Sequence, residues 1–163
     1  GRIIPRTMLE ITLIAMGNKM PGWVVEASQE FIKRLGEAFK LNLIEIPLLR
    51  RGHAHDLIRV LEKEASRLHA AIPRGAHLIA LDLTGKTFSS EQLSVHLNHL
   101  QQITGHICFV IGGPEGLPKS CLALSRERWS LSTLTLPHPL ARVVLLEALY
   151  RAWSILTNHP YHK

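Results

Sequence analysis

Two adjacent glycines, Gly112 and Gly113, follow a run of apolar residues and are the first candidates for a binding site. Glycine adopts backbone angles that other residues avoid, and without a Cβ it lets the main chain approach a ligand closely. Pro114 and Gly116 then restrict the turn that follows. The pattern predicts a loop whose amide and carbonyl groups line a pocket. An ordinary strand-to-helix turn has the same residues, so both interpretations stay open.

The segment 131–139, Leu-Ser-Thr-Leu-Thr-Leu-Pro-His-Pro, is unusually apolar for a loop. Its leucines alternate with serine and threonine, and two prolines flank His138. Burying such an irregular segment requires partners for its backbone groups, and a ligand in a cleft can provide them. A third candidate loop, Asp82 to Lys86, also follows an expected strand, where open α/β sheets bind their ligands.

These loops need a scaffold of strands and helices, which the hydrophobic pattern predicts. Strands are expected over 8–15, 41–47, 77–83, 107–111 and 129–131. Helices are expected over 23–39, 57–72 and 89–103, in a short segment before Trp129, and from Pro139 onward. Asp56 is a good N-cap for the second helix, and Ser89 with Gln92 has the spacing of a capping box. The alternation predicts an α/β fold with an open, mostly parallel sheet flanked by helices.

Two of these helices carry patterns that predict what covers them. Apolar residues at four-residue steps predict a stripe against the sheet in the first helix: Trp23, Ala27, Phe31, Leu35 and Phe39. The last helix is polar only along a narrow stripe: Glu147, Arg151, Ser154 and Asn158. Because a sheet covers only one of the remaining apolar sides, we expect a second subunit, related by two-fold symmetry, to cover another. Coverage by loops of the same chain is the alternative.

Length and composition are those of one globular domain of 163 residues. Residues 1–7 resemble an expression remnant, which leaves a single domain over 8–163. The formal net charge of +6 is compatible with a polyanionic partner but does not by itself indicate one. Since the sequence has neither an apolar run long enough to span a bilayer nor a signal-peptide pattern, a cytoplasmic location without membrane contact is expected.

Two kinds of site are excluded by their patterns. Cys108 and Cys121 are too few and too far apart for a metal knuckle or a disulfide framework, so no metal site is predicted. A dinucleotide-binding Rossmann fold requires G-x-G-x-x-G after the first strand and an acidic residue after the second. The first motif is absent, and the second expected strand ends in Ile46 and Pro47.

Four separated motifs resemble those of the RlmH-type pseudouridine N3-methyltransferases of the SPOUT superfamily. In chain order they are Ile-Gly-Gly-Pro-Glu-Gly at 111–116, Trp-Ser-Leu-Ser at 129–132, Leu-Thr-Leu-Pro-His-Pro-Leu at 134–140 with Arg142, and Tyr-Arg-Ala-Trp-Ser-Ile at 150–155 continuing through Asn-His-Pro-Tyr-His at 158–162. The segment 17–21 matches as well, so the likeness extends over essentially the whole chain from Met8.

The resemblance implies a C-terminal trefoil knot that binds S-adenosylmethionine in a bent form. It also implies a homodimer with a composite cleft, which methylates the ring nitrogen at position three of a pseudouridine. The substrate implied is large-subunit ribosomal RNA, within the assembled ribosome. The residues that would line the cofactor pocket are Leu81, Gly112, Gly113, Leu131, Ser132, Thr133, Leu134, Thr135 and Leu136.

Removing the imide proton of the base creates an anion, which cations and oriented donors stabilise. Arg142 is expected near the nucleotide or the methionine carboxylate, with a structural ion pair to Glu147 or another acid as the alternative. Tyr161 and His162 become candidates for RNA contact, and His138 or His162 for the proton acceptor. The competing hypothesis is a non-catalytic ribosome-binding module that uses the basic loop at Arg50 and Arg51.

Overall fold

The structure is a computed structural model that describes residues 8–53 and 56–163. Its strands are β1 (Glu10–Met16), β2 (Lys40–Ile46), β3 (His77–Lys86), β4 (His106–Ile111) and β5 (Glu127–Trp129). Its helices are α1 (Gly22–Leu35), α2 (Leu57–Ala71), α3 (Ser90–Ile103), α4 (Lys119–Leu124), α5 (His138–Leu156) and the 3-10 helix η2 (Pro160–His162). The predicted remnant, residues 1–7, lies outside the described residues.

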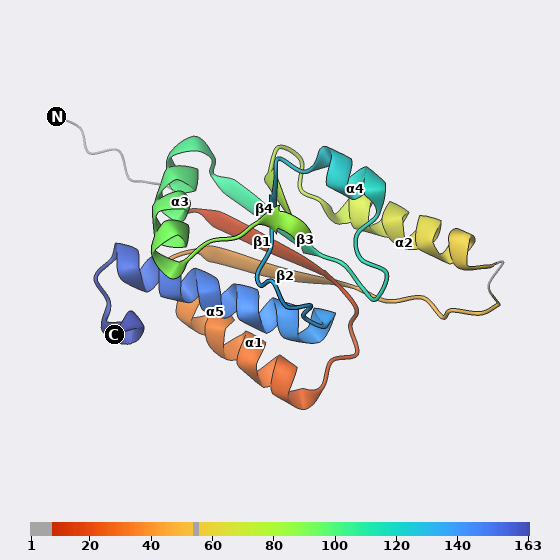
Figure 1. Cartoon of the computed structure of the whole chain (residues 1–163), viewed down its shortest axis with the longest axis horizontal. Helices are drawn as coiled ribbons and strands as arrows, with labels where there is room; N and C mark the ends of the chain where they lie inside the picture. The colour runs from red at the N-terminus through yellow and green to blue at the C-terminus, as the bar shows by residue number, and fades with distance from the viewer. Residues whose placement is uncertain (1–7, 54–55) are drawn as a thin grey trace.

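The five strands form one sheet in the order β2-β1-β4-β3-β5 (Figure 1). Every neighbouring pair is parallel, so each connection returns from the carboxyl ends of the strands to their amino ends. This confirms the predicted open α/β sheet. The trefoil knot implied by the resemblance stays a prediction.

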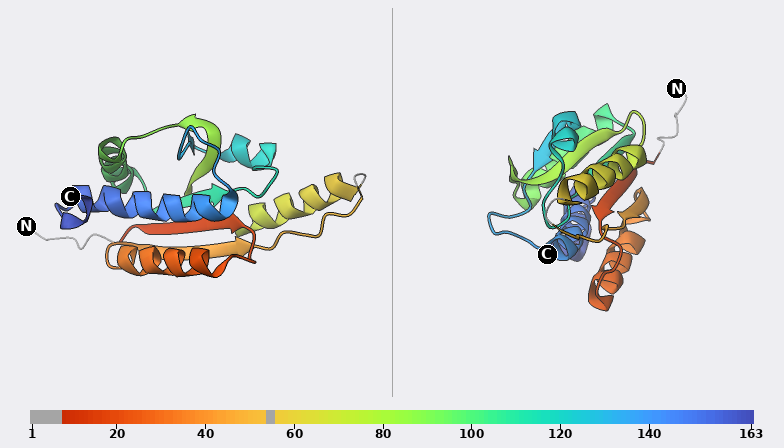
Figure 2. Two further views of the ribbon diagram at one scale, coloured as in Figure 1. Left: turned by 60° about the horizontal axis from the view of Figure 1, so that its bottom comes forward. Right: turned by 90° about the vertical axis from the view of Figure 1, so that its right-hand side faces the viewer.

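Helices cover both faces of the sheet (Figure 2). Side chains along the central strands therefore alternate between the two faces of the sheet. Ile11 and Leu13 of β1 join the core beneath α1, α3 and α5. Ile14 and Met16 join the core beneath α2 and α4. Both sets of side chains are buried, which explains the continuous apolar runs 13–16 in β1 and 107–111 in β4.

Helix α5 lies between α1 and α3 on one face of the sheet (Figures 1 and 2). All of its residues are buried or half-buried within the single chain. Two helices of the same chain therefore provide part of the cover for which a second subunit was expected, whereas Val143, Val144 and Ile155 remain partly exposed, and the homodimer stays a prediction. The expected polar stripe is wrong at Ser154, which is 0% exposed and donates to the Arg151 carbonyl.

Helix α1 ends at Leu35, so Phe39 lies in the turn before β2 and not in the helix as predicted, and two further helix predictions need correction. Trp23 does not join a buried stripe: it is 54% exposed, because the buried face of α1 is centred on Val24, Ser28 and Leu35. Asp56 directly precedes α2 but its side chain makes no capping hydrogen bond. The capping box of α3 is confirmed, with hydrogen bonds in both directions between Ser89 and residue 92.

Strands β3 and β5 depart most from the predicted bounds, whereas the other strands differ by one or two residues at their ends. The expected turn at 84–86 is strand, because β3 continues to Lys86 and pairs there with Trp129 across a β-bulge. Pairing with a distant strand thus outweighs the local turn preference of Gly85. Strand β5 begins at Glu127 and ends at Trp129, two residues earlier than expected.

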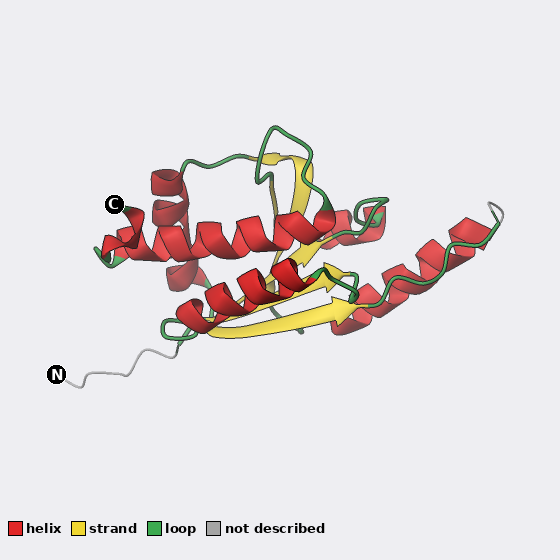
Figure 3. Cartoon of the chain, turned by 90° about the horizontal axis from the view of Figure 1, so that it is seen from below, coloured by secondary structure: helices red, strands yellow, loops and turns green. Residues whose placement is uncertain are grey.

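Helix α2 and the segment that leads to it project past the carboxyl ends of β1 and β2 (Figure 3). The same edge of the sheet carries the loops that follow β4 and β5. Among the described residues, no helix is both long and apolar enough to cross a membrane.

Candidate functional site

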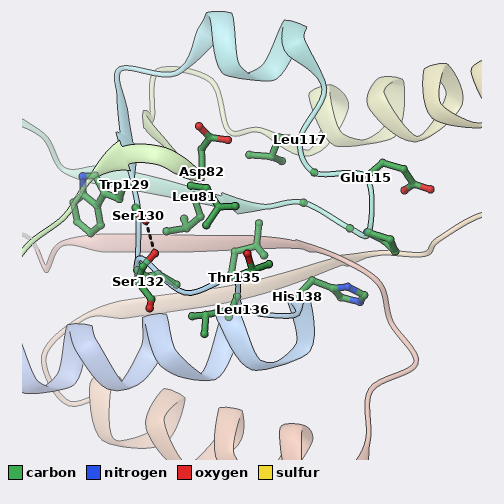
Figure 4. A pocket seen from close by; sticks show the side chains of 18 of the residues that line it. Leu81, Asp82, Glu115, Leu117, Trp129, Ser130, Ser132, Thr135, Leu136 and His138 are labelled. Carbon is green, nitrogen blue, oxygen red and sulfur yellow. Dashed lines mark hydrogen bonds between the residues drawn. The ribbon is translucent and has the colours of Figure 1, made fainter.

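A cavity of about 390 Å³ opens at the carboxyl edge of the sheet, between the ends of β3, β4 and β5 and the start of α5 (Figure 4). This volume lies within the range of pockets that hold small molecules. The cavity is formed by four segments: residues 81–83, 111–117, 129–136 without Thr133, and the first turn of α5. Each predicted loop therefore contributes to one site, as expected where parallel strands end.

Glycine is required in the loop that follows β4. A Cβ on Gly112 would lie 2.5 Å from the carbonyl carbon of Gly116 and 2.7 Å from the Leu117 nitrogen. Real Cβ atoms do not approach backbone so closely, because the loop folds back on itself through a bridge between Gly113 and Gly116. The loop thus presents main chain, without side-chain obstruction, to the cavity.

The segment after β5 forms a second wall. The Ser130 hydroxyl donates to the Ser132 carbonyl over 2.8 Å, and the Leu134 amide donates to the Ser132 hydroxyl over 2.9 Å. These bonds fix an irregular backbone, and Figure 4 shows the Ser130–Ser132 bond beside the cavity. Leu131 and Leu136 also pack against the main core. The wall is therefore apolar and internally hydrogen-bonded.

Strand β5, which leads into this wall, is held by one carboxylate. Glu127 accepts from Trp129 Nε1 over 3.0 Å, and its two oxygens lie 2.5 and 2.6 Å from the Nε2 atoms of His77 and His96. Burial alone would raise the pKa of Glu127, but hydrogen bonds from Trp129, His77 and His96 outweigh it and lower the pKa. The indole of Trp129 is buried against Phe109.

Eight of the nine residues expected to hold the cofactor line the cavity, and Thr133 does not. Ten further residues line the cavity that were not named as cofactor contacts, although most of them lie within the predicted loops and motifs. These are Asp82, Leu83, Ile111, Pro114, Glu115, Gly116, Leu117, Trp129, Ser130 and Ala141. Most directly adjoin a predicted residue along the chain, which is the one signal that could have found them.

His138 also lines the cavity, at the first residue of α5. Its half-buried ring loses solvation, and Arg142 adds a positive charge nearby. Burial first and this charge second lower the pKa of His138 below its ordinary value of 6.5. The ring is therefore mainly neutral at pH 7 and able to accept a proton.

Arg142 lies one turn further along α5 but does not line the cavity. Its side chain is 3% exposed and pairs with Glu45 over 2.7 Å. It also donates to the Gly17 carbonyl over 3.0 Å, while its Nε has no partner. The partner acid is thus on β2, and the guanidinium joins the carboxyl ends of β1 and β2 to α5.

The C-terminal candidates lie elsewhere in the chain. The Tyr161 hydroxyl donates to Glu147 over 3.1 Å, and the His162 Nδ1 lies 3.2 Å from the Ser154 hydroxyl. Burial, then the carboxylate of Glu147, raises the pKa of Tyr161. Glu147 lies about 13 Å from His138 along the axis of α5. One chain therefore does not bring the tail and the cavity together.

The cysteines have no features of a reactive site. Burial raises the pKa of Cys108 to about 12 and that of Cys121 to about 11, so both remain protonated thiols near neutral pH. Within residues 8–53 and 56–163, no cluster of three or more His, Cys, Asp or Glu side chains has the geometry to hold a metal ion.

Comparisons with known proteins agree with one another. A sequence model of the family described as "Predicted SPOUT methyltransferase" matches residues 9–162. Two proteins named ribosomal RNA large subunit methyltransferase H, from Legionella pneumophila strains Paris and Lens, are each 60% identical to this chain over 156 residues. These residues cover 96% of the chain and 100% of each relative.

A solved structure of a probable methylase family protein from Haemophilus influenzae Rd KW20 aligns with a TM-score of 0.58 at 14% identity, over 96% of this chain and 72% of that one. This likeness concerns the fold alone. The cavity behind Gly112, the parallel sheet and a family match over nearly the whole chain lead to one conclusion: this chain belongs to the SPOUT methyltransferase family.

Proposed function

We propose that this protein transfers a methyl group from S-adenosylmethionine to the ring nitrogen at position three of a pseudouridine in large-subunit ribosomal RNA. The observation that carries the proposal is the cavity at the carboxyl edge of the sheet, which the Gly112 loop and the 130–136 segment enclose. Both relatives at 60% identity bear the name of a ribosomal RNA large subunit methyltransferase. Their full length is matched, which supports the same activity here.

The residues present fit the methyl donor. The Gly112 loop offers backbone amides and carbonyls to the purine and ribose, and Leu81, Leu131 and Leu136 provide apolar surface. S-adenosylmethionine supplies a methyl group on a positively charged sulfur, which is ready for transfer to a nucleophile. The protein must hold that group in line with the target nitrogen and keep water away.

His138 is the proposed proton acceptor, because it lines the cavity and its lowered pKa keeps it neutral. It would take the imide proton of the base as the nitrogen attacks the methyl carbon. Arg142, held by Glu45 and the Gly17 carbonyl, places a fixed positive charge behind His138. That charge favours the anion that develops on the base.

Tyr161 and His162 are proposed to contact RNA in a composite site. Within one chain they pack beside Glu147 and Ser154, away from His138. In a two-fold homodimer, the tail of one subunit can approach the cavity of the other. Arg34 of α1 and Arg151 of α5 lie over the Tyr161 ring, so positive charge suited to phosphates lies beside the tail. Since ribosomes are the proposed substrate, a cytoplasmic location belongs to the same proposal.

The test is transfer of a labelled methyl group to purified ribosomes that lack the modification. Assembled 70S particles, isolated large subunits and free ribosomal RNA serve as parallel substrates. We expect incorporation at one pseudouridine, most efficiently on assembled particles. Binding of RNA without incorporation would contradict the proposal, and so would a protein that produces no heat on titration with S-adenosylmethionine.

A further inference from the structure

Arg51, in the segment that follows β2, connects two distant parts of the chain. Its Nε and Nη2 donate to the two oxygens of Glu115 over 3.1 and 2.7 Å. Its Nη1 and Nη2 also donate to the two oxygens of Glu64 on α2, and Nη1 donates to the Leu49 carbonyl over 2.7 Å. One guanidinium thus holds two carboxylates, each through both oxygens, a geometry that a lysine cannot reproduce.

The α2 side of this connection is firmly anchored. Glu64 is buried, and it accepts a further hydrogen bond of 2.7 Å from the Leu49 amide. Its carboxylate is therefore fixed by the main chain as well as by Arg51. Because hydrogen bonds to both carboxylates favour the charged form, the pKa of Arg51 is raised, and the bond from Arg51 lowers the pKa of Glu115. Arg51 and Glu115 are therefore both ionised at neutral pH.

The other side of the connection is the Gly112 loop. Glu115 lines the cavity, whereas Arg51 does not. A second contact lies beside the first: a Cβ on Gly113 would come within 3.0 Å of the Leu48 side chain. The segment 48–51 therefore supports the loop from behind at two points, one apolar and one ionic. No other described contact holds the Glu115 side chain with comparable geometry.

We propose that Arg51 is a positioning residue of the methyl-donor site. It acts through Glu115 to keep the 112–116 loop in the shape that receives the donor, and it does not touch the reacting atoms. This inference rests on the proposed function. It predicts a specific kinetic signature, in which removal of Arg51 weakens donor binding while the transfer rate at saturating donor is preserved.

The experiment compares the affinity for S-adenosylmethionine, by calorimetry, of the full-length protein and its variants. Arg51→Ala should weaken binding about tenfold or more, since a loop displaced by a fraction of an ångström loses its fit to the ligand. Arg51→Lys should be intermediate, because lysine keeps the charge and loses the fork. The matched control is Arg59→Ala, because Arg59 is an exposed arginine on α2, and this variant should bind the donor as tightly as wild type.

A second variant protects the test against misfolding. Glu115→Gln leaves the Arg51–Glu64 pair in place and should still weaken donor binding. The double variant Arg51→Ala, Glu115→Gln should bind no more weakly than the weaker single variant, because both changes break one connection. Single-turnover methyl transfer at saturating donor should stay within about twofold of wild type for Arg51→Ala.

Each outcome decides the matter. Wild type that produces no heat with the donor would overturn the proposed function, and this inference with it. Wild type that binds while both Arg51→Ala and Glu115→Gln bind equally well would overturn this inference alone. Additive losses in the double variant, or a transfer rate that falls together with affinity, would also contradict a positioning role.

Discussion

The two ends of α5 contrast in how the chain uses its side chains. At the amino end, His138 and Ala141 line a cavity that the main chain at Gly112 and apolar side chains such as Leu131 and Leu136 enclose. At the carboxyl end, the rings of Tyr150 and Tyr161 lie 4.5 Å apart, and the Tyr161 hydroxyl is bonded to Glu147. The first end has an open cavity of the size that small molecules occupy. At the second end, the Tyr161 hydroxyl and the His162 Nδ1 already have partners within the chain.

This difference suggests that the two ends serve different ligands. A rigid, glycine-lined cavity suits a cofactor of constant structure. A tail of aromatic, basic and histidine side chains suits a nucleic acid, which can exchange these internal contacts for stacking and phosphate contacts. The predictions below separate the two roles, beginning with the largest expected effect.

Gly112→Ala should weaken donor binding at the cavity and leave the carboxyl end of α5 unchanged. The added methyl would lie 2.5 Å from the Gly116 carbonyl carbon, so the loop must move, and we expect donor affinity to fall about a hundredfold. Calorimetry with S-adenosylmethionine measures it, with thermal unfolding recorded beside it. Gly105→Ala is the control, because its methyl would meet nothing within 4 Å. Unchanged affinity in Gly112→Ala would show that the donor binds elsewhere.

A mixture of variants tests whether the ends of two chains meet. His138→Ala and Tyr161→Ala should each reduce methyl transfer at least about tenfold. Coexpressed at equal levels, they should recover about a quarter of wild-type activity, since half of the dimers are mixed and each of these has one complete site. Activity that stays at the level of the single variants would place both residues in one chain.

Stability should distinguish the arginines of the two ends. Arg142→Met leaves Glu45 without its buried partner and should cost about 2–3 kcal/mol of unfolding free energy. Arg151→Met breaks a pair whose arginine is 36% exposed and should cost less than about 1 kcal/mol. Urea unfolding of both variants measures the difference. Similar losses of unfolding free energy would mean that the ion pair at the amino end of α5 stabilises the fold no more than the pair at the carboxyl end.

The smallest expected effect concerns pH. Because burial and Arg142 lower the pKa of His138, the proton acceptor is neutral above that pKa, and the transfer rate should fall only in acid, below pH 6.5. Arg142→Met removes the positive charge, so the pKa of His138 should rise and the acid limb should move to higher pH. NMR titration of the ring and single-turnover rates should move together. An acid limb that stays at the same pH whatever the state of His138 and Arg142 would identify a different proton acceptor.

Local patterns in the sequence predict this fold well wherever the cause is local. The capping box at Ser89 and the apolar run of β4 depend on neighbours within a few residues, and both are found as predicted. The end of β3 was predicted wrongly, because the bulge at Lys86 depends on pairing with Trp129, which lies in another part of the sequence. Trp23 is exposed although Leu35 of the same predicted stripe is buried, because each four-residue step drifts by about 40° around a helix of 3.6 residues per turn.

The site follows the same rule. Glycines and leucines that line the cavity were predictable, since their types reveal close approach and apolar surface. The ion pairs behind it were not. Arg142 meets Glu45 at a separation of 97 residues, and Arg51 meets Glu115 at a separation of 64. Nothing in the local sequence of either arginine names its partner, because only the crossovers of the sheet bring them together.

The position of Trp129 has a practical consequence. This indole is buried, bonded to Glu127, and directly followed by the wall of the cavity, whereas Trp23 is exposed and Trp153 half-buried. A soluble quencher such as iodide reaches exposed indoles and spares an enclosed one. The remaining emission therefore comes mainly from Trp129, at the start of the pocket wall. The protein thus carries a native fluorophore that reports when that wall shifts.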